Sequence, residues 1–200
     1  MIIRCIDMDH TKSKDSLRGM DREACLLRCQ KIYDHPLYQK HFESLQELEK
    51  DRIFCRHTFE HFMDVARIAY IMNLEQELGL SKEIIYAAAL LHDIGRDEQY
   101  INGTSHEVAS AKIAEEILGE CGFGDDEIRM IVEAIKSHRG SKEKNCEDNN
   151  SCTREELDDS ILKLSGIIYI ADKASRQCFS CEAQNECNWS MDKRNLEISI

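Results

Sequence analysis

An apolar stretch in the middle of the chain ends abruptly in a histidine and an aspartate. Residues 84–91 are all aliphatic, aromatic or alanine, and they lead directly into His92-Asp93, which Gly95 and Arg96 soon follow. A helix that is apolar on nearly every side belongs in a core, where a polar group is costly unless it finds a partner. For an isolated pair, the simplest partner is a hydrogen-bonding group at the helix end.

The composition favours an all-α chain. Pro36 is the only proline among 200 residues, aromatic residues make up 6%, and 42% hydrophobic residues are enough to build a core. The formal net charge of −12 argues against a broad nucleic-acid-binding surface, which needs clustered Lys and Arg. No apolar run has the length of a membrane span or the form of a secretory signal. We therefore expect a cytoplasmic protein that binds no membrane, and any phosphorylated substrate would need bound metal for part of its attraction.

Apolar periodicity, capping patterns and glycine stops predict where the helices lie. Thr104 with Glu107, and Thr153 with Glu156, match the capping box that opens a helix. The expected helices cover approximately 56–78, 81–92, 104–118, 125–138 and 153–176, with loops at 96–103 and 141–151. We predict three parts: an N-terminal helical extension at 1–54, a helical core at 55–177 and a cysteine-rich tail at 178–200.

Four further helices each place a polar residue on the face that should be buried. These residues are His61, His106, His138 and Asp172, each in helical register with aliphatic side chains. Together with His92 and Asp93 they make six metal-ligand side chains, and one shared metal centre would satisfy all of them. Imidazole and carboxylate suit divalent iron, manganese, cobalt, zinc or magnesium, and six ligands leave room for two ions, with Asp93 as the expected bridge. His57, one turn before His61, is interpreted as a support for a ligand or a substrate contact.

With these His and Asp residues in this order, the sequence resembles the HD-domain metal-dependent phosphohydrolases. The segment His92-Asp93-Ile94-Gly95-Arg96 is similar to the family's best-known motif, with Arg in place of the frequent Lys, and the likeness covers residues 56–176. The resemblance implies an HD-type helical bundle and an enzyme that hydrolyses phosphoric esters or anhydrides with a metal-activated water. Residues 133–140 and 167–173 look most like the bacterial symmetrical diadenosine tetraphosphate hydrolases. The polar insert after His138 and the cysteine tail are departures from that branch.

The resemblance also implies roles for individual residues. His61, His92, Asp93 and Asp172 would hold one ion, and Asp93, His106 and His138 the other. Asp93, Arg96 and Arg139 are the expected catalytic residues. His57 and Lys173 are expected either to contact substrate or to support a ligand, although Lys173 could equally be a solvated charge. The expected substrate is a nucleotide, a dinucleoside polyphosphate or a related small phosphoester. Two alternatives stay open: an HD-type di-iron oxygenase, and a non-enzymatic module that senses metal or redox state.

The tail carries a second candidate metal site. Cys178, Cys181 and Cys187 are three of the ten cysteines, and their spacing resembles the downstream three cysteines of iron-sulfur nucleases. In a reducing compartment such thiols suit zinc or an iron-sulfur cluster better than disulfides. The best candidate for a fourth ligand is Cys55, which precedes the His57/His61 helix. Cys25 and Cys29 are alternatives, and free thiols are the competing interpretation.

Overall fold

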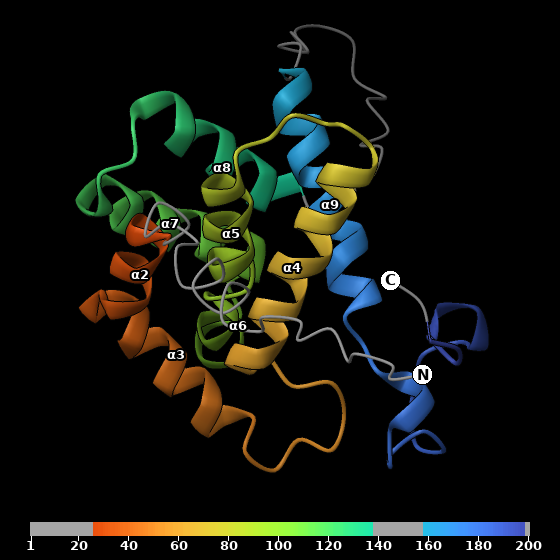
Figure 1. Ribbon diagram of the computed structural model, residues 1–200. Coiled ribbons are helices and arrows are strands. Elements are labelled where there is room, and N and C mark those ends of the chain that lie inside the picture. The colour runs from red at the N-terminus through yellow and green to blue at the C-terminus, as the bar shows by residue number, and fades with distance from the viewer. Residues whose placement is uncertain (1–25, 138–157, 199–200) are drawn as a thin grey trace, which may run out of the picture.

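The computed structural model describes residues 26–137 and 158–198, and within these ranges the chain is helical without strands (Figure 1). This confirms the predicted all-α class. The α-helices are α2 (Leu27–Asp34), α3 (Pro36–Leu48), α4 (Phe59–Glu75), α5 (Lys82–Leu91), α6 (Arg96–Asn102), α7 (His106–Cys121), α8 (Asp125–Ser137) and α9 (Asp159–Ala174). Two single-turn 3-10 helices, η2 (Cys178–Ser180) and η3 (Met191–Lys193), lie in the tail.

Helix α5 forms the centre of the bundle. Seven of its residues are buried, which are Ile84, Ile85, Ala87, Ala88, Ala89, Leu90 and Leu91. The helix contacts α2, α4, α7, α8 and α9, so it has neighbours on all sides, as its apolar sequence predicts. Helices α4 and α9 also pack against each other (Figure 1). The end of α5 is therefore held in the middle of the protein, next to the ends of several other helices.

The first two described helices pack onto this bundle. Helix α2 contacts α5 and α7, and α3 contacts α6 and α7. Arg28 on α2 connects the extension to the bundle. Its guanidinium forms ion pairs with Glu83 at 2.7 Å and with Glu127 at 2.6 Å. It also lies 4.2 Å from the centre of the Phe123 ring. Buried apolar residues such as Ile32 and Leu45 join the same core. The division at residues 54 and 55 stays a prediction.

Two local predictions were wrong. Residues 96–103, expected as a loop, contain α6, which starts after Gly95, carries Asp97 and Glu98 in its first turn and ends at Gly103 with φ of 73°. Acidic residues near a helix N-terminus and a left-handed glycine after its end stabilise even so short a helix. The capping box at Thr104 also does not form as expected, because α7 begins one residue later with Ser105 as its N-cap.

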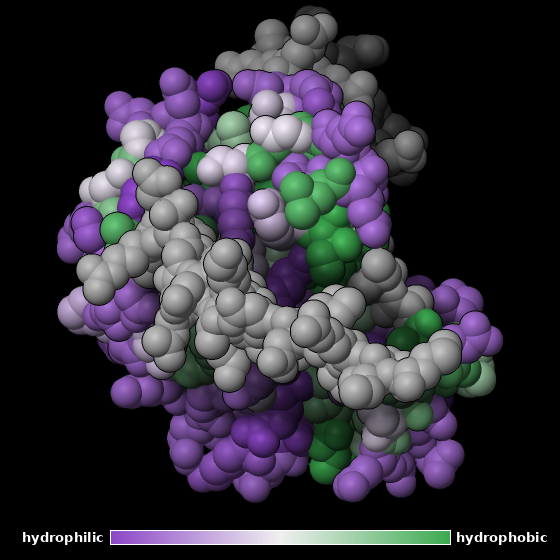
Figure 2. Space-filling model, in the orientation of Figure 1, coloured by the Kyte–Doolittle hydropathy of each residue, from purple (hydrophilic) through white to green (hydrophobic). Residues whose placement is uncertain are grey.

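Several predicted features lie outside the described residues. These are the first 25 residues with Cys25, the residues His138 and Arg139, the loop at 141–151, and the capping box of Thr153 and Glu156. Among the described helices, none combines the length and the apolar character needed to cross a membrane. Figure 2 shows mostly hydrophilic side chains around the edge of the face seen in Figure 1.

Candidate metal centre

The His-Asp pair lies at the buried end of α5. His92 is 0% exposed and Asp93 is 2% exposed, so both need polar neighbours. The Nδ1 atom of His92 lies 2.7 Å from the carbonyl oxygen of Ala89. A carbonyl oxygen only accepts hydrogen bonds, so Nδ1 of His92 carries the proton and donates it. Nε2 then carries the lone pair and is directed away from the helix, towards Asp93.

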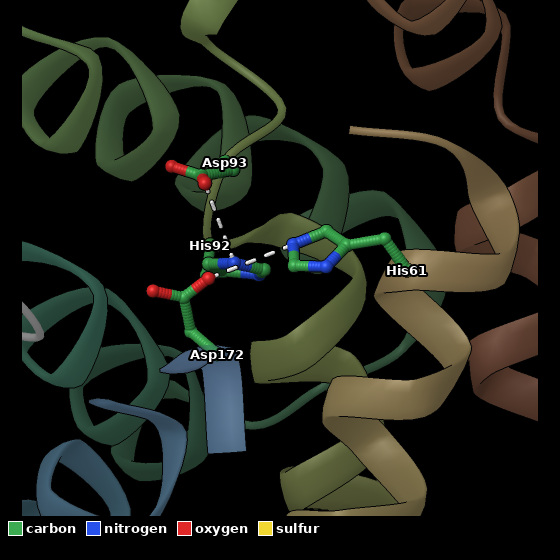
Figure 3. A group of neighbouring side chains, drawn as sticks. All are labelled: His61, His92, Asp93 and Asp172. Carbon is green, nitrogen blue, oxygen red and sulfur yellow. Dashed lines mark ion pairs between the residues drawn. The ribbon is translucent and has the colours of Figure 1, made fainter. Parts of the chain in front are cut away.

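Four residues from three parts of the chain meet at this point (Figure 3). His61 comes from α4, His92 and Asp93 follow α5, and Asp172 comes from α9. One ligand atom from each lies within 4.8 Å of the others. The Nε2 atom of His61 is 3.7 Å from Asp172 Oδ1, and the Nε2 atom of His92 is 3.5 Å from Asp93 Oδ2. Two imidazoles and two carboxylates at this separation could hold a divalent cation.

His61 is held in the same tautomer as His92. Thr58 caps α4 by accepting a hydrogen bond from the His61 backbone amide. The Ser175 hydroxyl donates to the Asp172 carbonyl oxygen at 2.8 Å, so it is an acceptor for His61 Nδ1 at 3.2 Å. Burial and the nearby His92 lower the pKa of His61 to about 4, which keeps this imidazole neutral. A neutral imidazole with a free Nε2 lone pair is the form that binds metal.

The two oxygens of Asp93 face different histidines. Oδ1 lies 3.1 Å from His106 Nε2, whereas Oδ2 lies 3.5 Å from His92 Nε2 and 3.4 Å from His57 Nε2. Arg96 Nε also lies 3.1 Å from Oδ2. Burial alone would raise the pKa of Asp93, but His92, Arg96, His57 and His106 together hold it well below its usual value. Asp93 is therefore a buried carboxylate whose two oxygens face different imidazoles.

His106 reaches Asp93 because the turn after α5 packs directly against α7. The Gly95 amide donates to the Ser110 hydroxyl at 2.9 Å. A Cβ at Gly95 would lie 2.4 Å from the Ser110 backbone nitrogen and 2.7 Å from Ala109. Only glycine allows this approach. The Nδ1 atom of His106 then lies 3.0 Å from Gln99 Oε1 on α6, which again leaves Nε2 directed at Asp93.

Glu49 is a buried partner that sequence reasoning missed. It is 2% exposed and accepts hydrogen bonds from the His57 backbone amide and from His57 Nδ1, both at 2.7 Å, and from the Tyr100 hydroxyl at 2.8 Å. Burial opposes its ionisation, but the contacts with His57 and Tyr100 lower the pKa of Glu49 to about 2. His57 is thereby fixed with Nε2 towards Asp93. Glu49 gave no signal in the sequence because it follows a polar helix and resembles an exposed residue.

A pocket of about 720 Å³ opens beside this cluster. His57, His61 and Asp172 contribute to its wall, and the other lining residues come from the loop before α4, from the start of α6, from α9 and from the tail. Six of its lining side chains are cationic: Arg52, Arg56, Arg96, Lys173, Arg176 and Lys193. Lys173 Nζ lies 3.4 Å from Asp172 Oδ2 and 3.8 Å from the centre of the Tyr169 ring. Trp189 adds an aromatic surface to the same wall.

The structure places most of the predicted residues around this centre. His57, His61, His92, Asp93, Arg96, His106 and Asp172 meet there, and Lys173 lines the pocket. His138 and Arg139 are outside the described residues. The predicted cysteines Cys55, Cys178, Cys181 and Cys187 surround a separate, adjoining pocket. A second group of potential ligands, His41, Asp97 and Glu98, includes a buried 2.9 Å pair between His41 and Asp97 that joins α3 to α6.

Comparison with known proteins identifies the class of protein. The HD domain family model matches residues 58–177, which include α4 to α9 and the whole described cluster. The chain belongs to the HD-domain family, so the resemblance found in the sequence is confirmed at this level.

Three individual proteins are similar to this chain in sequence or in structure. An uncharacterized protein of Clostridium beijerinckii is 41% identical over 179 residues, which cover 90% of this chain and 99% of that protein. Ribonuclease Y of Mycoplasma mycoides is 34% identical over 94 residues, 47% of this chain but only 20% of that enzyme. The crystal structure of a predicted HD superfamily hydrolase from an uncultured Thermotogales bacterium aligns with a TM-score of 0.53 at 19% identity over 81% of each chain. That structural match shows the same fold.

Proposed function

We propose that this protein is a metal-dependent phosphohydrolase that acts on a nucleotide, a dinucleoside polyphosphate or a related small phosphoester. The observation that carries the proposal is the cationic pocket beside the His/Asp cluster. Six Arg and Lys side chains and two aspartates line it, although the whole chain has a formal charge of −12. Such a local reversal of charge favours an anionic ligand.

The orientation of the histidine side chains supports the proposed binding of metal. Carbonyl and hydroxyl acceptors hold the Nδ1 protons of His92 and His61, so that both Nε2 atoms face the cluster. The Nε2 atom of His61 is buried and has no hydrogen-bond partner among the described residues, as expected for a ligand atom. We assign His61, His92, Asp93 and Asp172 to one ion. Asp93 and His106 would serve a second ion, together with the predicted ligand His138.

Bound divalent metal would lower the pKa of a water molecule and offset charge on the phosphoryl oxygens. The chain's own residues would orient the substrate. Arg96 is anchored on Asp93 at 3.1 Å and can donate to a phosphoryl oxygen from a fixed position. Arg56 and Lys193 line the outer pocket, where further phosphates would lie. His57 is held by Glu49, which fixes its Nε2 atom 3.4 Å from Asp93 Oδ2 at the edge of the pocket.

The dimensions of the pocket suit a nucleotide. Its volume of about 720 Å³ lies within the usual range for small-molecule sites. Trp189 is 46% exposed on its wall and, with the Arg176 guanidinium 4.7 Å from its ring centre, offers an aromatic and cationic surface for contact with a base. The similarity to ribonuclease Y makes a short RNA phosphodiester a further substrate to test. We favour small substrates because the acidic chain does not suit binding of long nucleic acids.

The experiment compares purified protein loaded with manganese, cobalt or ferrous iron against a panel of substrates. The panel contains mononucleotides, diadenosine tetraphosphate and a short oligoribonucleotide, with products separated by chromatography. Asp93→Asn and His92→Gln should abolish turnover, because each removes a proposed ligand. Lys193→Gln should lower kcat/KM by about 10-fold, mainly through KM, since a hydrogen bond to a charged group contributes about 1.5–3 kcal/mol.

The matched control is Arg129→Gln. Arg129 is an exposed cation on α8 that pairs with Asp126 and does not line the cationic pocket. Its loss should leave kcat/KM unchanged, although it alters the net charge by the same amount as Lys193→Gln. No turnover of any phosphorylated substrate with fully loaded metal, or full activity in Asp93→Asn, would refute the proposal.

A further inference from the structure

Three cysteines of the tail and one that is far from them in the sequence line one pocket beside the HD site. Cys55 lies before α4, whereas Cys178, Cys181 and Cys187 belong to the tail after α9, and all four contribute to a pocket of about 330 Å³. None of them forms a disulfide. The pKa of Cys55 is raised by burial and by the proximity of Cys178, with Arg176 opposing. The fold therefore gathers four thiols, the number that completes a structural metal site.

The described part of the tail has almost no apolar core. Ala183 is its only buried residue in the described range 178–198, and η2 and η3 bury none. Arg194 donates to the backbone oxygens of Gln184, Cys187 and Trp189, so polar contacts replace an apolar core. A segment this short without a core generally needs a disulfide or a metal to fix its conformation.

The spacing of the sulfurs indicates the kind of centre. A tetrahedral zinc ion with Zn–S bonds of about 2.3 Å brings its sulfurs to about 3.8 Å from one another. Among the described residues, no three of these sulfurs lie within 4.8 Å of each other. They instead surround a pocket that has room for a larger group. This arrangement suits an iron-sulfur cluster, which places iron and sulfide between the cysteine ligands.

We propose that Cys55, Cys178, Cys181 and Cys187 ligate an iron-sulfur cluster that fastens the tail to the HD domain. The four thiols are not among the ligands proposed for the His/Asp centre, although Cys55 and His61 line both pockets, and the cluster does not depend on the proposed phosphohydrolase activity. The cluster would also lie next to the cationic pocket, because Arg176 and Trp189 line both pockets. The Arg176 guanidinium lies 4.7 Å from the centre of the Trp189 ring. The cluster would thus fix one wall of the substrate pocket.

The test uses the full-length protein, purified without oxygen and reconstituted with ferrous iron and sulfide. Iron, zinc and acid-labile sulfide are measured per chain together with visible absorption. Labile sulfide is diagnostic, because iron bound at the His/Asp centre brings none. Wild-type protein should contain iron and labile sulfide, and Cys55→Ser and Cys181→Ser should each lose nearly all of the sulfide.

Cys121→Ala is the matched control, since Cys121 is a buried thiol on α7 that lines neither pocket. It should retain the cluster. Circular dichroism should show unchanged helix content in Cys55→Ser and Cys181→Ser, because both residues lie outside the helices α2–α9. Wild-type protein without labile sulfide, or with one zinc per chain in its place, would overturn the cluster. Retention of the sulfide by Cys55→Ser would overturn the assignment of the fourth ligand.

Discussion

Glu49 provides a quantitative test of how the His57 side of the site is stabilised. Its pKa falls from 4.5 to about 2 because the buried carboxylate is bonded to His57 and Tyr100. A pKa difference of this size corresponds to about 3 kcal/mol of folding free energy at neutral pH, at about 1.4 kcal/mol per pKa unit. Since the folded-state pKa is the lower one, this stabilisation is present above pH 4.5 and is lost as the pH falls towards 2.

The perturbation is Glu49→Gln, which keeps the size of the side chain but removes the charge. We expect it to lower the free energy of unfolding by about 3 kcal/mol at pH 7 and by only about 1 kcal/mol at pH 3, where the wild-type carboxylate has already lost much of its advantage. Urea unfolding followed by circular dichroism measures both values. Chelator-treated protein is used throughout, so that bound metal does not contribute to stability.

Glu47→Gln is the control on the same helix. Glu47 is exposed and pairs only with Lys50 among the described residues, so its substitution should change stability by less than about 0.5 kcal/mol at either pH. An equal loss of unfolding free energy in Glu49→Gln at pH 7 and pH 3 would refute a stabilisation by the charge of Glu49. A loss no larger than that of Glu47→Gln would refute it as well.

Three further predictions follow from the packing and hydrogen bonds of the site. Gly95→Ala should destabilise the protein by about 3 kcal/mol in thermal unfolding because its Cβ would overlap the backbone of α7, whereas Gly119→Ala on the open face of α7 should stabilise it by up to about 1 kcal/mol. In protein loaded with manganese at the His/Asp centre, His106→Ala should reduce the bound manganese from two ions to one per chain by elemental analysis. Ser175→Ala should weaken metal binding by about 10-fold in a chelator competition, because His61 loses its Nδ1 acceptor.

The sequence was sufficient to predict the class of fold and the meeting of His61, His92, Asp93 and Asp172 in space. An apolar helix that ends in His92-Asp93, with His61 and Asp172 on the apolar faces of other helices, leaves few arrangements other than a shared buried centre. Helix α6 was not predicted because its seven residues are too few for a clear apolar period. The role of Glu49 was not predictable either, since its burial depends on contacts with His57 and Tyr100 that only the tertiary structure creates.

The orientation of the imidazoles is the feature that best distinguishes this centre from a chance meeting of polar residues. His57, His61, His92 and His106 each place Nδ1 against an acceptor, which is respectively a carboxylate, a hydroxyl, a backbone carbonyl and an amide oxygen. Different parts of the chain supply these acceptors, yet the Nε2 atoms of all four rings lie within 3.7 Å of Asp93 or Asp172. Histidines that served only as packing residues would not need one common tautomer. A site that must present several lone pairs to cations would need it, and the buried Glu49 and the partly buried Ser175 supply two of the acceptors that set it.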